Sequence, residues 1–304
     1  MMDVMTRASA FILCIAAGYL FKRAGFFKKE DFRLISRIVL TITLPCAVIT
    51  NFMKLNVPLY LIWVVPIGFF CNVLMSGLGW LLGRRHGKER QAFNIINFSG
   101  YNIGCFTMPY VQSFLGPAGV VSTCLFDAGN ALLCVGGTYA VAANMVGKSQ
   151  QRGFWPIVKK TFSSVPLWSY LIMLVISALH LPLPRVVLTF ADIVGSANGF
   201  LAMLMLGIGF EIQLPKGQGA RIAQILAVRY GVAVLVSAAL FFLLPFDLEI
   251  RQAMALVAFA PVSAVCAAYT ERIGGDVALS ACTNSISILV SIAVLTAMIL
   301  MFGL

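Results

Sequence analysis

Ten apolar stretches fill most of this 304-residue chain, and they restrict its fold more than any other feature. A helix needs about 20 mainly apolar residues to cross the hydrocarbon core of a bilayer. Only 11% of the residues are charged, whereas soluble domains carry about 25%. Most of the stretches also lack the polar face that a helix of a soluble protein turns to water. The sequence therefore predicts an all-α integral membrane protein with ten transmembrane helices.

The predicted spans fall into two halves of five. They cover residues 5–22, 34–53, 58–82, 92–114, 118–146, 165–181, 193–212, 222–245, 251–270 and 278–303. The polar connection 147–164 lies between a first repeat at 1–146 and a second repeat at 165–304. Because five is an odd number, the second repeat would be inverted in the membrane relative to the first, as in many secondary carriers.

Basic residues gather in alternate connections. Of the 22 lysines and arginines, 17 lie in connections that follow odd-numbered spans, whereas the even-numbered connections hold Lys54, Arg185 and Arg251. The positive-inside rule then places the odd connections in the cytoplasm and both termini outside, for a protein of the inner (plasma) membrane. The net charge of +11 is therefore mostly a topology signal. It predicts contact with the lipid bilayer rather than a nucleic-acid partner.

The fourth and ninth spans are interrupted, at Asn102–Pro109 and at Pro261–Cys266. Pro removes a backbone donor and clashes with the preceding turn, and Gly allows the chain to unwind. Placing Gly116 on Gly274 brings Gly104 onto Val262, so the two interruptions occupy matching places. Non-helical backbone in a membrane is tolerated only beside protein or a water-filled cavity. Matched interruptions indicate a transporter's binding site; two Pro-kinked structural helices are the alternative.

If the two interrupted spans cross, four half-helix ends meet inside the membrane. The amino-terminal ends carry partial positive charge and free N–H groups, which suit an anion such as a carboxylate. We therefore expect a small organic anion as the substrate. The candidate substrate-binding residues are Asn102, Gly104, Thr107, Pro109, Pro261, Ser263 and Asn284. Asn284 and Ser287 belong to a run of small polar residues in span 10, and such runs more often serve close helix packing.

Two charged residues are expected deep in spans. Asp127 lies about 14 Å into span 5, and an intramembrane carboxylate is a candidate functional group. With Asn130 on nearly the same face, it is a candidate for coupling or gating; the alternative is a carboxyl satisfied by Ser or Asn neighbours that holds span 5 to span 4. Arg229 lies about 12 Å into span 8. It is predicted to pair with a carboxylate or to extend toward the cytoplasmic surface. A structural role is favoured over anion binding, and Arg229 is kept with Asp127 and Asn130 as a candidate for coupling or gating.

No motif of a soluble enzyme is present. The chain lacks a phosphate loop, a nucleotide fingerprint, a Ser/His/Asp set and the sequence H-E-x-x-H. The eight cysteines show neither C-x-x-C nor zinc spacing, so they are predicted to be small buried hydrophobes. We expect no catalytic residues, no metal site and no cofactor.

Several motifs, in this order along the chain, resemble those of one family. They are Leu44-Pro45, Asn102 to Pro109 with its Asn-to-Pro spacing of seven, Phe126-Asp127 with Asn130, Leu206-Gly207, and Ala260-Pro261 through Glu271. With them the chain resembles the auxin efflux carrier family, which includes plant PIN auxin carriers and bacterial malonate-transporter-like proteins. The resemblance covers nearly the whole chain.

The resemblance implies a scaffold domain and a transport domain whose broken spans 4 and 9 cross, in a fold shared with bile-acid sodium symporters. It also implies organic-anion transport by elevator-like alternating access, with Asn102, Pro109 and Pro261 at the substrate site. Unlike sodium-coupled relatives of that fold, this chain has no acidic residue at the span 9 crossover, since Glu271 lies beyond it. A proton or the membrane potential is therefore preferred to sodium as the driving force.

A sodium-coupled symporter and a membrane sensor that does not transport remain the alternatives. The sequence leaves open the identity of the substrate, the direction of transport and the oligomeric state, with a homodimer as one option.

Overall fold

The computed structural model describes residues 2–28, 30–55, 57–149, 155–210 and 217–304, and its regular elements there are helices. Up to residue 146 they are α1 (Met2–Arg23), α2 (Asp31–Ile38), η1 (Val39–Thr43), α3 (Leu44–Phe52), η2 (Leu59–Trp63), α4 (Val64–Gly83), α5 (Lys88–Phe98), η3 (Ile103–Thr107), α6 (Met108–Phe114), α7 (Pro117–Leu132), η4 (Leu133–Gly137) and α8 (Thr138–Met145). The later ones are α9 (Trp155–Thr161), α10 (Val165–Ala178), α11 (Arg185–Ser196), α12 (Asn198–Gly209), α13 (Gly219–Phe242), α14 (Leu248–Val257), α15 (Val265–Arg272) and α16 (Val277–Phe302). The turns η1, η3 and η4 are π-helical, and η2 is a 3₁₀ turn.

Seven helical stretches in these ranges are long and apolar enough to cross a membrane. They are Val4–Arg23, Asp31–Phe52, Leu59–Gly83, Pro117–Met145, Arg185–Gly209, Gly219–Phe242 and Val277–Phe302. The protein is therefore an α-helical membrane protein. Of the three remaining predicted spans, the fourth and ninth are each divided into shorter helices, and the sixth is the 14-residue α10. The count of ten spans and the inverted repeat stay predictions.

The seventh predicted span begins too late in the sequence. We predicted residues 193–212, but the helix starts at Arg185, directly after Pro184, and its description ends at Gly209. Asp192, which is more typical of a connection, lies inside α11. A charged side chain near the end of a span can reach the interface, so it does not stop the helix.

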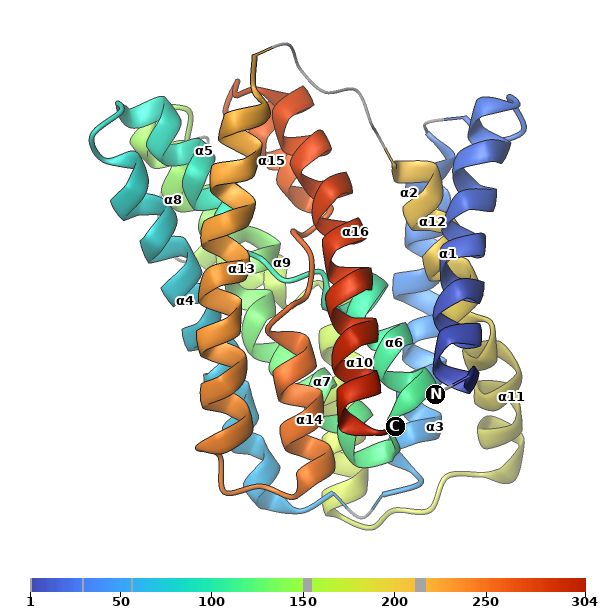
Figure 1. Cartoon of the computed structure of the whole chain (residues 1–304). Helices are drawn as coiled ribbons and strands as arrows, with labels where there is room; N and C mark the ends of the chain where they lie inside the picture. The colour runs from blue at the N-terminus through green and yellow to red at the C-terminus, as the bar shows by residue number, and fades with distance from the viewer. Residues whose placement is uncertain (1, 29, 56, 150–154, 211–216) are drawn as a thin grey trace.

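The helices pack as two groups. The smaller group consists of α1, α2–α3, α10 and α11–α12, and the larger group consists of α4–α8 and α13–α16. Figure 1 shows them side by side, with α1, α11 and α12 on one side and α4, α5 and α13 on the other. Each group draws helices from both predicted repeats. The carboxyl ends of α1, α4 and α15 lie at one end of the molecule, opposite the α13–α14 connection.

Within each group, glycines let two helix backbones touch. In the smaller group, a Cβ on Gly18 of α1 would overlap the backbone of α12 at Leu204, and one on Gly207 would overlap Ile15. In the larger group, Gly68 of α4 and Gly129 of α7 lie just as close to the facing backbone at Phe126 and Val65. Small residues at such contacts allow tight packing between membrane helices. Each group is therefore held together by contacts that tolerate little internal movement.

Candidate functional site

The two interrupted segments meet through their backbones. The N–H of Asn102 donates to the carbonyl oxygen of Pro261 over 3.0 Å, and Tyr101 and Val262 form an isolated antiparallel bridge. We use the term crossover for Ser99–Asn102 and Ala258–Ala264, the stretches without regular helix that make this contact. Backbone that leaves the helix inside a membrane protein needs such protein partners.

The first interruption lies earlier in the sequence than we predicted. The chain is non-helical from Ser99 to Asn102, whereas Thr107 and Pro109 are already helical, in η3 and in the first turn of α6. Proline is tolerated at the first helical positions because the N–H it lacks has no partner there. In the second interruption, Pro261–Ala264 is non-helical as predicted, while Cys266 belongs to α15.

Arg229 of α13 lies at the centre of the crossover. Its side chain is 2% exposed, and its guanidinium donates to four backbone oxygens, those of Phe98 (2.5 Å), Gly100 (2.9 Å), Ala260 (3.0 Å) and Pro261 (3.2 Å). Both predicted environments for this residue are therefore wrong. The side chain does not extend to the surface, and the four acceptors that the described residues supply are backbone oxygens rather than carboxylates. The bonds join the carboxyl ends of two broken helices to a third, continuous helix.

Two asparagines hold the first interruption. Asn130 of α7 accepts from the N–H of Tyr101 (3.3 Å) and donates to its carbonyl oxygen (3.2 Å). Asn72 of α4 donates to the side-chain oxygen of Asn130 (2.7 Å) and accepts from the N–H of Gly100 (3.4 Å). Our sequence reading did not single out Asn72. An amide inside a largely apolar membrane span would have been the signal for it.

Asp127 extends this network to the other helix group. Its two carboxylate oxygens accept from Asn130 of its own helix (3.0 Å) and from the hydroxyl of Tyr170 in α10 (3.0 Å). The expected Asn neighbour is present. The expectation that Asp127 holds span 5 to span 4 is wrong. Its hydrogen-bond partner outside α7, within the described chain, is Tyr170 of α10, a residue that the sequence did not indicate. As a whole residue Asp127 is partly buried, and both of its carboxylate oxygens are hydrogen-bonded.

The second interruption is held by α16. The N–H of Val262 donates to the hydroxyl of Ser287 (3.0 Å), and Asn284 donates to the carbonyl oxygen of Val262 (2.5 Å). Ser291 donates to the carbonyl oxygen of Phe259 (2.7 Å). The polar run of span 10 therefore serves helix packing at this break, which was the favoured interpretation. The amide of Asn284, a predicted substrate ligand, is engaged by the backbone.

Asn102 is different, because the amide nitrogen of its side chain is buried and has no hydrogen-bond partner among the described residues. Its backbone oxygen accepts from the N–H (3.2 Å) and the hydroxyl (3.4 Å) of Thr107. The helical half that starts at Ile103 leaves the N–H groups of its first turn without intrahelical acceptors. A Cβ on Gly104 would lie 3.2 Å from Leu44 of α3 and 3.7 Å from a carboxylate oxygen of Asp127. The start of η3 thus faces both the smaller group and Asp127.

The remaining predicted ligands are closed off from solvent. Pro261 and Ser263 are buried, and the hydroxyl of Ser263 accepts from the thiol of Cys134 (3.3 Å). A polar cleft of about 280 Å³ lies between α3, α6 and α11, lined by Ala47, Thr50, Asn51, Lys54, Pro109, Gln112, Ser113, Asp192, Gly195, Ser196 and Gly199. Pro109 is the predicted ligand that lines this cleft. The cleft lies along the seam between the two helix groups.

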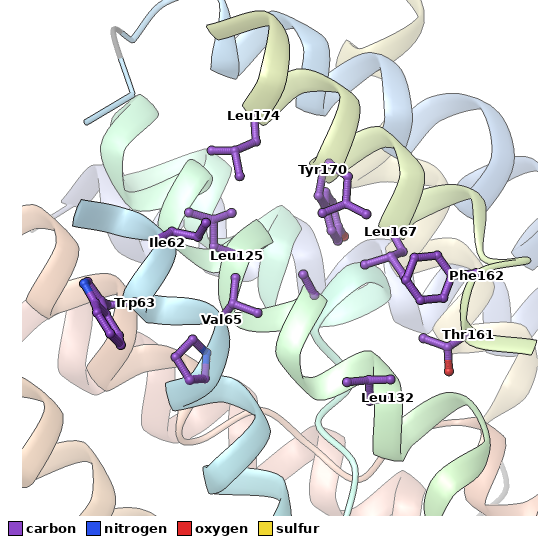
Figure 2. Close-up of a pocket in the computed structure, with 13 residues that line it drawn as sticks. Ile62, Trp63, Val65, Leu125, Leu132, Thr161, Phe162, Leu167, Tyr170 and Leu174 are labelled. Carbon is purple, nitrogen blue, oxygen red and sulfur yellow. The ribbon is translucent and has the colours of Figure 1, made fainter. Parts of the chain in front are cut away.

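A second, apolar cleft of about 430 Å³ lies along the same seam, between α4, α7 and α10. Figure 2 shows Val65, Leu125, Leu132, Leu167 and Leu174 around it, with Tyr170 on its wall. These side chains offer little to a carboxylate, so the polar cleft is the better approach for an anion. Among the described residues there is no group of three or more His, Cys, Asp or Glu that could hold a metal ion.

Comparison with known families identifies the chain. The model of the family described as membrane transport protein, which is the auxin efflux carrier family, matches residues 4–301, so the chain belongs to that family. A comparison with curated proteins finds no match.

Proposed function

From its membership of a family of membrane transporters, we propose that this protein is a secondary transporter of a small organic anion, a mono- or dicarboxylate. The observation that carries the proposal is the unpaired, buried amide of Asn102 at the start of a half-helix. A buried donor without an acceptor is unfavourable by about 1–3 kcal/mol. A carboxylate oxygen would remove that penalty when it binds.

The surroundings of Asn102 favour an anion. The first turn of η3 presents N–H groups and the positive end of a helix dipole, which together form an anion-binding arrangement. Thr107 adds a hydroxyl within the same turn. Asn102, Gly104 and Thr107 are therefore the main proposed ligands. Pro109 would line the approach, and Pro261, Ser263 and Asn284 would shape the opposite side of the crossover.

The packing supports elevator-like movement of the larger helix group against the smaller one. Backbone-to-backbone contacts at glycines lie inside each group, and Gly104 meets the smaller group only through side chains such as Leu44. The polar cleft of α3, α6 and α11 runs along the seam and reaches Pro109. In this arrangement, a sliding step would expose the buried Asn102 to one side of the membrane and then to the other.

A proton on Asp127 is the proposed coupling ion. Its carboxylate lies beside Gly104, where a second negative charge would be repelled. Tyr170, which donates to this carboxylate, and the cysteines Cys105 and Cys124 ordinarily lose their protons only above about pH 8. Binding of the anion should therefore weaken as the pH rises and Asp127 loses its proton.

Asp127→Asn tests this coupling. Asparagine imitates the protonated carboxyl and cannot change its charge, so anion binding should become independent of pH and stay tight at high pH. Binding is measured from ligand-induced thermal stabilisation of purified protein across a pH series. A variant whose affinity still follows the pH dependence of the original protein would contradict the role of Asp127.

The membrane orientation is part of the proposal. The excess of basic residues in odd-numbered connections supports an orientation with these connections in the cytoplasm and both termini outside the inner (plasma) membrane. Single cysteines in place of His86 and Leu304, labelled with an impermeant reagent in intact cells, test this directly. The proposal predicts labelling at position 304 and not at position 86. Labelling at position 86 and not at 304 would show the opposite orientation.

The transport proposal is tested by a screen of carboxylates. Those that raise the apparent thermal stability of the purified protein are then used in counterflow experiments with proteoliposomes. Binding with counterflow supports a carrier, whereas binding without counterflow supports the sensor. Counterflow that requires a sodium gradient supports the sodium symporter. If no carboxylate binds or moves, the proposal is wrong.

A further inference from the structure

Four carbonyl oxygens converge at the crossover from both interrupted segments. They belong to Phe98 and Gly100 on the first segment and to Ala260 and Pro261 on the second. In carriers with broken helices, unwound carbonyls and the carboxyl ends of half-helices are the groups that coordinate a sodium ion. Such ends carry partial negative charge, so bringing two of them together requires a cation.

In this protein, the cation at that position is a side chain. The guanidinium of Arg229 donates to all four oxygens over 2.5–3.2 Å and is almost fully buried. The ring of Tyr101 lies 5.1 Å from its central carbon, in the arrangement of a cation–π contact. Guanidinium is permanently charged and planar, and it holds several donors in a fixed pattern, so it can serve oxygens on two segments at once.

We propose that the guanidinium of Arg229 is a resident cation that holds the crossover together in place of a bound sodium or potassium ion. The crossover can then form whichever cations are present in solution. Because the guanidinium is part of the chain, the positive charge beside the carbonyl oxygens cannot dissociate. Through the proposed function, the inference also implies transport that is independent of sodium. The claim about the crossover itself needs no substrate to be tested.

A different explanation of the same contacts is that Arg229 only fills space and donates hydrogen bonds. The two explanations differ in whether the positive charge matters. Arg229→Lys keeps the charge with fewer donors, and Arg229→Gln keeps a donor without the charge. A resident cation predicts that the Lys variant is clearly more stable than the Gln variant. Equal stability of the two would overturn the proposal.

Rescue by added cations is the sharper test. Arg229→Ala should lower the apparent melting temperature by on the order of 10 °C, because buried negative ends lose their cation. Guanidinium at concentrations far below denaturing ones, or sodium or potassium, should restore part of that loss at constant ionic strength, whereas choline should not. If the Ala variant folds and no cation stabilises it more than choline does, the proposal is wrong.

Arg251→Ala is the matched control. Arg251 is an arginine at the start of α14 that donates to the carbonyl oxygen of Phe241 and lies away from the crossover. Its loss should not be rescued by any of these cations. If the Ala variant of Arg229 cannot be purified, the comparison of the Lys and Gln variants decides.

The original protein gives a further test. Its melting temperature should be the same in sodium, potassium and choline salts, and any flux should persist when choline replaces sodium. Stabilisation by sodium would show that the carbonyls still need an ion. Absence of flux with ion-independent stability would leave the resident cation intact and would count against the transport proposal alone.

Discussion

The two interruptions expose similar backbone groups but receive their hydrogen bonds from different helices. At the first, Asn72 and Asn130 bind Gly100 and Tyr101 from α4 and α7. At the second, α16 supplies a serine and an asparagine to Val262. Arg229 serves both segments. On each side, therefore, neighbouring side chains hold the backbone of the interruption.

The two sides differ in whether the side-chain amide of the predicted asparagine ligand, Asn284 or Asn102, has a hydrogen-bond partner. Asn284 donates its amide to the carbonyl oxygen of Val262, whereas the amide nitrogen of Asn102 is buried without a partner in the part of the chain that the structure describes. A folded protein seldom keeps such a group unless it has another use. In our proposal, the second side is a support and the first side carries the group that receives the ligand.

Among the substitutions that test this comparison, Asn130→Ala should have the largest effect on stability. The change removes both side-chain contacts to Tyr101 and the contact to Asp127. Because buried partners are left unsatisfied, we expect a loss of about 3 kcal/mol in stability, with loss of transport. Thermal unfolding measures it, with Asn144→Ala on the exposed surface of α8 as the control. A variant as stable as the control would mean that the first segment does not depend on α7.

Much of this arrangement can be predicted from sequence, for identifiable reasons. The length of an apolar run limits where a membrane helix can lie, so eight of the predicted spans begin within three residues of observed helices. Proline and small residues in the fourth and ninth spans indicate that these two are interrupted. The exact start of the first break was missed because Pro109 is also acceptable in a helical first turn.

The contacts of Arg229 could not be predicted in the same way. Its acceptors are backbone oxygens up to 131 positions away in the sequence, and every residue type carries such an oxygen. Likewise, no pattern relates Tyr170 to Asp127, since that hydrogen bond depends on how the two helix groups pack. The unpaired amide of Asn102 is a property of the assembled crossover, whereas sequence shows only an asparagine near a proline.

Asn284→Ala should have a smaller effect than Asn130→Ala. It removes a single donor, to the carbonyl oxygen of Val262, while Ser287 still holds the N–H of the same residue. We expect a loss of about 1–2 kcal/mol in stability and little change in substrate affinity. Thermal unfolding and ligand titration measure the two quantities. A large loss of affinity with unchanged stability would place the ligand on the second side instead.

Asn102→Ala should show the reverse pattern. No hydrogen bond of the amide nitrogen within the described chain is lost, and a buried donor that costs about 1–3 kcal/mol is removed, so stability should be kept or should rise. If the amide binds a carboxylate, affinity should fall about tenfold, which corresponds to about 1.4 kcal/mol. The same two measurements apply. Lower stability with unchanged affinity would reduce Asn102 to a structural residue.

Gly104→Ala should have a small effect on stability but should affect transport through the first side of the crossover. The added methyl group would lie 3.2 Å from the side chain of Leu44, which can shift slightly, so we expect a change within about 1 kcal/mol. Because Gly104 faces the seam between the helix groups, flux should nevertheless fall several-fold. Ligand affinity should be largely kept, since alanine retains the backbone N–H through which residue 104 would bind the anion. Gly77→Ala, whose methyl group would meet nothing within 4 Å, is the control. Equal flux in both variants would mean that the first side of the crossover does not move past α3 during transport.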